Sequence, residues 1–450
     1  MRGIFGSFAT IGRGALAVAL ATGVAAGGLG LGATVAVAKE KAPKAGQYSK
    51  EFIAASTPLQ KTIKALEPLQ KKLKSGGDTA AIKAEIRAAA TSAPAELAAA
   101  EAAIKTPSDK MAAGNWALSI GSALDDNKLQ QRGLQMMIDS ELVPAAEQSN
   151  YKFFLGQLAY NNKDYAAAVK ALTDVVAANS SQDAAAELLA DSYARQGQAA
   201  QGLEALKAAV ATRRAAGGVV PEDWFKRANT IAYNAKLGPQ AIEWSRELAS
   251  AYPEPISWLG AAQLVREYVT FSNQESLDLG RLIMRSGALQ SDPKFVEREY
   301  IEYIEAATKT GVPAEVVKVT NAGLTAGILK KTDVFVTDAL RDGSAGAARD
   351  KASLAADEKA ARAGADGKGA LASGDSYLSL EQPAKAEELF TLALTKGGID
   401  KDRAQMRLGI AQFDQGKFAE AKASFVQVGG VRADLAKLWG ALADSKAKGN

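Results

Sequence analysis

Residues 149–182 read SNYKFFLGQLAYNNKDYAAAVKALTDVVAANSSQ, and this stretch decides the fold. Its pair of Leu155 and Gly156 returns 34 positions later as Leu189 and Ala190. A period of this length is typical of one helical hairpin per unit, which is too small to bury its own apolar face. Neighbouring hairpins must therefore stack on one another, and the sequence predicts an all-α solenoid of stacked helical hairpins.

The pattern resembles the tetratricopeptide repeat (TPR), in which two antiparallel helices touch at small residues and large side chains fill the spaces beside them. The first two units carry it at Leu155, Gly156, Tyr160, Asp164, Tyr165, Ala168 and Leu172, and then at Leu189, Ala190, Tyr193, Gly197, Gly202 and Leu206. A third unit has Ala228, Tyr233, Ala241, Leu248 and Pro253, and a C-terminal block has Gly374, Tyr377, Ala386, Phe390, Leu408, Gly409, Phe418 and Phe425. The resemblance implies a TPR-like superhelix of eight or nine hairpins over residues 115–442.

The sequence predicts five segments along the chain. They are an export segment at 1–38, a basic helical lead-in at 39–113, a TPR-like solenoid at 114–340, a segment of low complexity at 341–366, and a TPR pair with a capping helix at 367–450. In the lead-in we expect a helix over 49–74, bent or divided at Pro58 and Pro68, and then two Ala-rich helices. In the segment rich in Ala, Gly and charge we expect a partly frayed helix pair.

The N-terminus is typical of a secretory signal. Arg2 and Arg13 precede an uncharged stretch at 14–38 that ends in small residues just before Lys39. We expect cleavage after Ala38 and a periplasmic body. The alternative is an uncleaved inner-membrane anchor, because 25 residues can span the hydrocarbon layer of a bilayer as a helix. Both interpretations place the body outside the cytoplasm.

Charge is distributed unevenly along the chain. The formal net charge is only +4, which argues against a nucleic-acid partner, but residues 39–74 carry nine Lys against three Glu. A run of this kind is most often a solvated helix face, and secondarily a contact for an anionic surface. Membrane association through this N-terminal region therefore stays an open alternative.

Residue types absent from the chain exclude much chemistry. There is no Cys and no His, which removes thiolate nucleophiles, imidazole catalysis and the usual zinc, copper and haem ligands. Ser149 and Lys152 have the spacing of a Ser-x-x-Lys pair, but they fall at a repeat junction where lysine is a routine surface residue. We expect no enzyme, no metal and no cofactor.

The TPR resemblance implies a groove lined by the first helix of each hairpin, where an extended or helical peptide binds. The positions that match this groove are Asn150, Phe153, Gln157, Tyr160, Asn161, Glu187, Asp191, Arg195, Asp223, Lys226, Tyr233 and Asn234. Phe153, Tyr160 and Tyr233 would anchor the ligand, while Lys226 and Arg227 would receive an acidic side chain. Glu187 and Asp191 disfavour capture of a free carboxylate, so the resemblance implies a ligand of mixed charge.

The resulting prediction is an interaction scaffold of the bacterial cell envelope that binds protein or peptide segments. Two alternatives remain open. One is an envelope enzyme or polysaccharide-processing factor, which would require two carboxyl groups about 5 to 9.5 Å apart in a cleft. The other is a membrane-anchored organising protein that keeps the segment at 14–38.

Overall fold

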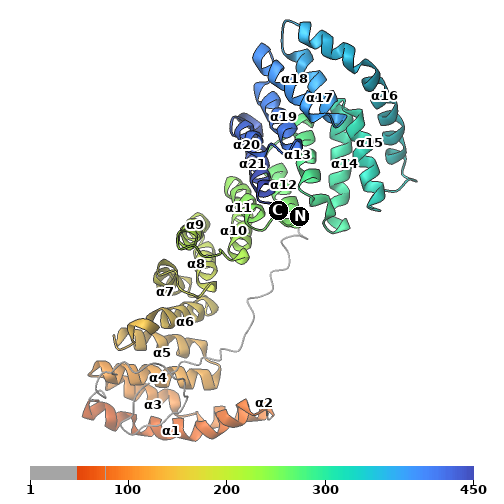
Figure 1. Ribbon diagram of the computed structural model, residues 1–450. Coiled ribbons are helices and arrows are strands. Elements are labelled where there is room, and N and C mark those ends of the chain that lie inside the picture. Colours follow the sequence, from red (N-terminus) through yellow and green to blue (C-terminus); the bar gives the residue numbers. More distant parts are fainter. Residues whose placement is uncertain (1–47, 77, 450) are drawn as a thin grey trace. The chain divides into compact units, whose positions relative to one another are not determined.

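The computed structural model describes residues 48–76 and 78–449, so the predicted export segment at 1–38 lies outside the described residues. Throughout the described part the chain forms helices and no strand (Figure 1). Within each unit, successive helices pack as antiparallel hairpins, and neighbouring hairpins pack against one another. The predicted all-α solenoid is thereby confirmed.

The chain divides into two compact units, 1–224 and 225–450. The division falls inside the stretch at 114–340 for which the sequence predicts one continuous solenoid, and it cuts through helix α10 (Glu222–Asn234). Each unit has its own helices and its own buried side chains.

The first unit begins with a lead-in of three helices, followed by three hairpins. Its helices are α1 (Lys50–Lys74), α2 (Thr79–Ala89), α3 (Ala93–Ala102), α4 (Pro107–Leu124), α5 (Asn127–Asp139), α6 (Gln148–Asn161), α7 (Tyr165–Ala177), α8 (Ala184–Arg195) and α9 (Ala199–Ala215), with a 3-10 turn η1 (Ala145–Glu147). The hairpins are α4 with α5, α6 with α7, and α8 with α9.

Helix α1 runs unbroken through Pro58 and Pro68, so the expected division of this helix is not observed. Both prolines lie on its exposed face, where water can satisfy the carbonyl groups that a proline leaves unpaired. The two Ala-rich helices predicted next in the chain are confirmed as α2 and α3.

Asp109, at the start of α4, ties the two ends of the lead-in together. Its buried carboxylate accepts hydrogen bonds from the backbone and hydroxyl of Ser49, at 3.0 and 2.8 Å, and from the backbone N–H groups of Lys105 and Thr106, both at 3.0 Å. Burial would raise its pKa, but these donors hold the pKa of Asp109 below its usual value.

The second unit contains five hairpins, one unpaired long helix and a closing helix. Its helices after α10 are α11 (Gly238–Ala251), α12 (Pro255–Tyr268), α13 (Asn273–Arg285), α14 (Pro293–Thr310), α15 (Pro313–Thr325), α16 (Val334–Ala363), α17 (Lys368–Ser379), α18 (Pro383–Lys396), α19 (Lys401–Asp414), α20 (Phe418–Val426) and α21 (Ala433–Ala447), with 3-10 turns η2 (Ala288–Gln290) and η3 (Gly430–Arg432). Trp439 of α21 is fully buried, packs on Phe413 and Phe425, and covers the last hairpin.

The expected helix pair at 341–366 is wrong, because α16 is one helix of 30 residues. Its two internal glycines lie against α15, where added Cβ atoms would stand 3.0 Å from the Val317 side chain at Gly343 and 2.7 Å from Pro313 at Gly346. Close packing on α15 therefore offsets the low helix propensity of glycine. Because α16 is a single helix, the numbering of the hairpins shifts after it. Before α16 the first helix of each hairpin in this unit has an even number, and after α16 it has an odd number.

This change brings four odd-numbered helices of the second unit together. α15 packs on α17, and α17 packs on α19, while side chains of α13 reach both α15 and α19. α21 lies against α11 and α12 of the same unit (Figure 1). The helices of this unit thus close on one another. No helix of the described part is both long enough and apolar enough to cross a bilayer.

Candidate functional site

The residues predicted to line a groove in the first unit lie on α6 and α8, which pack side by side. Each is fixed to its partner helix at a small residue. A Cβ added at Gly156 of α6 would lie 2.5 Å from the Leu172 side chain of α7, and one added at Gly202 of α9 would lie 2.5 Å from the carbonyl oxygen of Ala190. These close crossings hold α6 and α8 in one orientation, with a shared face turned away from α7 and α9.

Tyr160, Asp191 and Arg195 form a hydrogen-bonded cluster on that face. The Tyr160 hydroxyl donates to Asp191, and Arg195 Nε donates to the same carboxylate oxygen at 3.3 Å. The Tyr160 ring also meets Tyr165 edge-on, at 5.6 Å between centroids. The hydrogen bond to Asp191, with the carboxylate charge, raises the pKa of Arg195. Tyr160 is thus held between the two helices and is not a mobile anchor.

Gln157 and Asn161 are the polar residues of this face that remain available. Gln157 is half-buried and Asn161 is exposed, and neither side chain bonds to another residue of the described part. Asn150 is exposed and accepts a hydrogen bond from Gln182 at 3.1 Å, while Glu187 is half-buried. Unsatisfied amides on a half-buried face can bond to the backbone of an extended peptide.

Phe153 requires a correction, because its side chain is only 6% exposed. It belongs to the cluster that joins α6, α7 and α8, together with Ala168, Leu172 and Leu188. A residue this deeply buried stabilises the stacking of the hairpins and leaves little surface for a ligand.

The remaining predicted residues belong to the second unit or to the helix that crosses the division. Asp223 is exposed, Lys226 and Arg227 are half-buried, and Asn234 is exposed. Tyr233 is half-buried and lies near Tyr268, whose pKa is raised by burial and by Tyr233. Lys226, Arg227, Tyr233 and Asn234 therefore belong to the second unit, whereas Asp223 and the predicted residues of α6 and α8 belong to the first.

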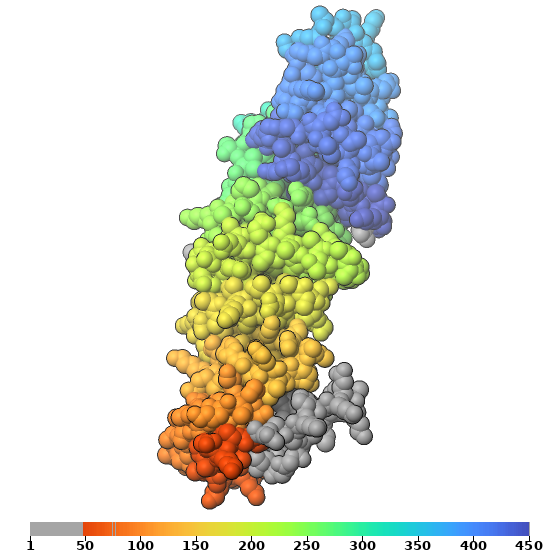
Figure 2. Space-filling model, turned by 90° about the vertical axis from the view of Figure 1, so that its left-hand side faces the viewer, coloured from red at the N-terminus to blue at the C-terminus, as the bar shows by residue number. Residues whose placement is uncertain are grey.

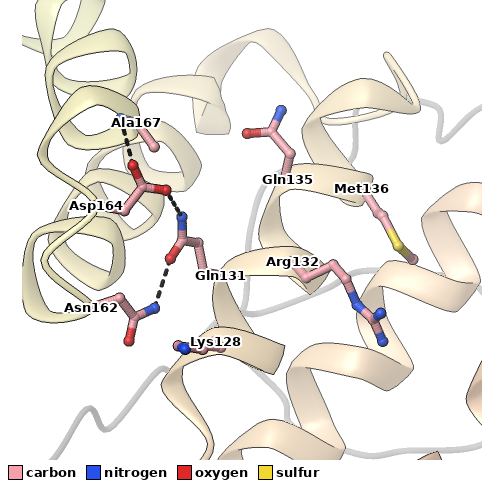
Figure 3. A pocket seen from close by; sticks show the side chains of 8 residues that line it. All are labelled: Lys128, Gln131, Arg132, Gln135, Met136, Asn162, Asp164 and Ala167. Atoms are coloured by element: carbon pink, nitrogen blue, oxygen red, sulfur yellow. Dashed lines mark hydrogen bonds between the residues drawn. The ribbon is translucent and has the colours of Figure 1, made fainter.

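A surface pocket of about 500 Å³ lies in the first unit between α5 and the turn from α6 to α7 (Figure 3). Its polar side chains bond mainly to one another. Asn162 donates to Gln131 at 2.6 Å, Gln131 donates to Asp164 at 3.1 Å, and Asp164 accepts from the backbone of Ala167 at 3.2 Å. None of the residues predicted for the groove lines this pocket, and its self-paired wall offers few free groups to a ligand.

The most extensive polar cluster of the second unit was not predicted. Arg281 of α13 and Arg407 of α19 are both fully buried, and both donate to Asp278, at 3.2 and 3.3 Å. Arg281 also donates to both carboxylate oxygens of Glu315 on α15, at 3.1 Å each. Arg407 pairs with Asp375 on α17 as well. We call Asp278, Arg281, Glu315, Asp375 and Arg407 the buried charge cluster.

Further bonds complete a closed circuit through four helices. The Ser379 hydroxyl of α17 accepts from the backbone of Glu315 at 3.1 Å, and Tyr303 donates to Glu315 at 3.0 Å. Arg285 of α13 donates to both oxygens of Asp414 on α19, at 2.5 and 2.6 Å. Hydrogen bonds therefore run from α13 to α15, to α17, to α19 and back to α13.

The electrostatics of the buried charge cluster follow from burial and pairing. Burial opposes the charge of both partners, yet the Glu315 carboxylate keeps the pKa of Arg281 raised, and Arg281 keeps the pKa of Glu315 below its usual value. Arg281 thus favours the ionised form of the Glu315 carboxylate. This arrangement suits a structural tie and not a general acid, which would need a raised pKa.

The sequence gives almost no signal for this cluster. Asp278 and Arg281 are three positions apart, which is the spacing of an ordinary pair on a helix surface. Their partner Arg407 lies 129 positions from Asp278. Among the described residues, no group of three or more acidic side chains is placed to hold a metal ion.

Comparison with known proteins names no family. No protein-family model matches the sequence, and no curated protein matches it. Solved structures similar to the chain include the TPR2AB domain in a pHSP90 complex of yeast Sti1, with 13% identity, 67% of this chain and 100% of that chain covered, and a TM-score of 0.24. The Naa15/Naa10 complex bound to HypK-THB has 16% identity, coverage of 85% and 69%, and a TM-score of 0.28.

A third similar structure is the Cut9–Hcn1 hetero-tetramer of the APC/C, with 14% identity, 73% of this chain and 68% of that chain covered, and a TM-score of 0.24. Scores this low carry no argument about function. The TPR-like fold stands on the stacked hairpins of the chain itself.

Proposed function

We propose that this protein is a non-enzymatic scaffold that binds a protein segment on the shared face of α6 and α8, and that it acts in the bacterial cell envelope. The observation that carries the proposal is the pair of unbonded amides, Gln157 and Asn161, on a face whose neighbours are already fixed. A backbone segment laid along this face would satisfy both amides. The envelope location rests on the export pattern at 1–38.

The charges beside the amides favour a ligand of mixed character. Arg195 is 57% exposed and keeps an open guanidinium edge, although one of its N–H groups is bonded to Asp191. Glu187 on the same helix adds a half-buried carboxylate. A segment that carries both an acidic and a basic residue therefore complements this face better than a uniformly charged one.

The second unit supports a scaffold in another way. The circuit of hydrogen bonds through α13, α15, α17 and α19 occupies the side on which these helices meet. A ligand there would have to displace buried, paired charges, which costs several kcal/mol. Binding is therefore assigned to the first unit.

Site-specific photo-crosslinking in the full chain tests the proposal. A photoreactive phenylalanine analogue at position 157 or 161 should give a discrete protein adduct in envelope preparations. The same analogue at Lys170, an exposed position on α7, should give none. Adducts of equal yield at all three positions, or none at 157 and 161, would contradict the assignment of this face.

A double variant gives a second measurement. Gln157→Ala with Asn161→Ala should weaken binding of the crosslinked partner by about 10-fold, because two hydrogen bonds of about 0.5 to 1.5 kcal/mol are lost. Unchanged circular dichroism would show that the hairpins remain folded. Cell fractionation tests the envelope location, and recovery of the body only in the cytosol would overturn that part of the proposal.

A further inference from the structure

Helix α1 has one apolar face and one basic face. At about 100° per residue, its buried side chains fall within an arc of about 80°. These buried residues are Phe52, Ser56, Leu59, Ile63 and Leu66. They pack against α2, α3 and α4, which lie on this side only.

The opposite side of α1 carries a row of lysines. Lys50, Lys61, Lys64 and Lys71 are all exposed and fall within an arc of about 80°, centred about 140° from the buried one. We call these four residues the lysine face. No acidic side chain of the described part pairs with any of them. Glu51 lies about 100° from Lys50 around the helix, and Glu67 lies about 40° from Lys71, although no ion pair joins either acid to the lysine face in the described residues.

Three other exposed residues, Ile53, Thr57 and Pro68, lie within this arc, and Ile53 is 50% exposed. The exposed Ala65 and Pro58 lie about 40° and 60° beyond its edge. Lys72, at the edge of the arc, lies 3.3 Å from Glu85, and both side chains are about half exposed. The row from Lys50 to Lys71 covers about 32 Å of helix at a rise of 1.5 Å per residue. It therefore presents spaced cations on a flat strip with small apolar groups between them.

The position of α1 leaves this strip open. α1 is the first helix of the first unit, drawn in red at its end in Figure 2, and every described helix that packs on it lies on the apolar side. In the sequence, Lys50 lies twelve positions after Ala38, the last residue of the uncharged stretch at 14–38. A linker of that length reaches at most about 40 Å.

We propose that the lysine face binds the surface of an anionic phospholipid bilayer, independently of the peptide face on α6 and α8. Lysine ammonium groups on a straight strip can each meet a phosphate of a planar surface, and a half-exposed isoleucine can enter the headgroup layer. Nucleic acid fits less well, because the strip has no arginine for bidentate phosphate contacts and no aromatic ring for stacking.

Vesicle flotation with the full chain tests this inference. The probes are vesicles of phosphatidylcholine with 30% phosphatidylglycerol, and vesicles of phosphatidylcholine alone. The variant replaces all four lysines, Lys50→Glu, Lys61→Glu, Lys64→Glu and Lys71→Glu. The control makes the same charge change at exposed lysines of the second unit, Lys330→Glu, Lys331→Glu, Lys351→Glu and Lys359→Glu.

We expect the lysine-face variant to partition onto anionic vesicles at least 50-fold more weakly than the wild type, because each surface lysine contributes about a factor of five. The control should bind anionic vesicles less than about 5-fold more weakly than the wild type. Added salt should remove the difference in binding between the wild type and the lysine-face variant. Binding to neutral vesicles should be equal for all three proteins, since any insertion of the segment at 14–38 is common to them.

Three results would overturn the inference. They are equal anionic partitioning of wild type and lysine-face variant, an equal loss in the control, and tighter binding of duplex DNA than of anionic vesicles through the same four lysines. A milder set, the same four lysines changed to glutamine, keeps the test valid if the glutamate variant misfolds. The crosslinking yield at position 157 should not change in either variant, so failure here would leave the proposed peptide face standing.

Discussion

Glycines at the helix crossings differ in what an added methyl group would meet. At Gly202 a Cβ would lie 2.5 Å from the carbonyl oxygen of Ala190, which is backbone, while at Gly156 it would meet only the side chain of Leu172. At Gly440 of α21 nothing lies within 4 Å. An alanine substitution at each position therefore tests a different effect. At Gly202 it tests a collision with backbone, at Gly156 a collision with a side chain, and at Gly440 helix propensity alone.

We predict that Gly202→Ala destabilises the first unit by about 3 kcal/mol and Gly156→Ala by about 1 kcal/mol, because a side chain can change its rotamer more easily than a helix can move. Gly440→Ala should stabilise the second unit by about 0.5 to 1 kcal/mol. Urea denaturation of the three variants measures these changes. Equal losses at 202 and 156 would show that Leu172 is as rigid as the backbone.

The buried charge cluster makes a second prediction at the same scale. Arg281→Met should cost about 3 to 5 kcal/mol at pH 7, because Glu315 and Asp278 lose a buried partner. The control, Arg341→Met, removes an exposed pair and should cost less than about 1 kcal/mol. Thermal or urea unfolding measures both variants.

The pH dependence of that cost has a definite sign. The pKa of Glu315 in the folded protein lies below its unfolded value of 4.5, although burial alone would raise it, because Arg281 stabilises the carboxylate. Its stabilising contribution is complete above pH 4.5 and is lost as the pH falls through the folded pKa. In the Arg281→Met variant the unpaired Glu315 carboxyl can take up a proton. The difference in free energy of unfolding between this variant and the wild type should therefore become smaller towards pH 4. A gap that widens in acid would contradict this account.

Among the elements, α1 depends on one side chain of another helix. Asp109→Asn replaces a carboxylate that accepts four hydrogen bonds with an amide whose NH₂ group faces donors. We predict a loss of about 3 kcal/mol and at least 10-fold faster hydrogen exchange in α1, measured by mass spectrometry. Asp78→Asn at the start of α2 keeps its accepting oxygen and should change exchange in α1 little.

Element boundaries also show where sequence patterns work. The helices α6 to α9 follow the 34-residue period because each crossing needs a small residue at a fixed position. The segment at 341–366 was expected as a frayed pair because its glycines and charges lower helix propensity. In the structure, contacts of Gly343 and Gly346 with the preceding helix α15 favour one long helix, and helix propensity does not record such contacts between helices.

For the whole molecule, closure of the second unit is the property to test. Arg407→Leu removes the bonds that Arg407 of α19 makes to Asp278 on α13 and to Asp375 on α17. We predict a loss of about 3 to 5 kcal/mol confined to the second unit, with hydrogen exchange in α4 to α9 unchanged. Lys422→Leu, which removes an exposed pair with Asp444, is the matched control and should have little effect. Faster exchange in both units would contradict independent closure.

The candidate site shows a similar limit of sequence reasoning. The resemblance predicts which helices form a groove and which polar positions line it, including Gln157 and Asn161, and this assignment stays a prediction. It also assigned Phe153 to the groove, whereas packing between α6, α7 and α8 buries this ring. A position in the repeat does not by itself determine how exposed its side chain is, because burial depends on how each hairpin packs against the next one.

The sequence by itself determined that this chain is a stack of helical hairpins, because small and aromatic residues recur at the spacing that two packed helices require. It also determined the basic row on α1, because a helix repeats every 3.6 residues and places Lys50, Lys61, Lys64 and Lys71 on one side. Only the tertiary structure decided that α16 is one helix and that buried arginines close the second unit. Those outcomes depend on contacts between different helices, up to 129 positions apart for Arg407 and Asp278, and no local pattern records which side chains will meet.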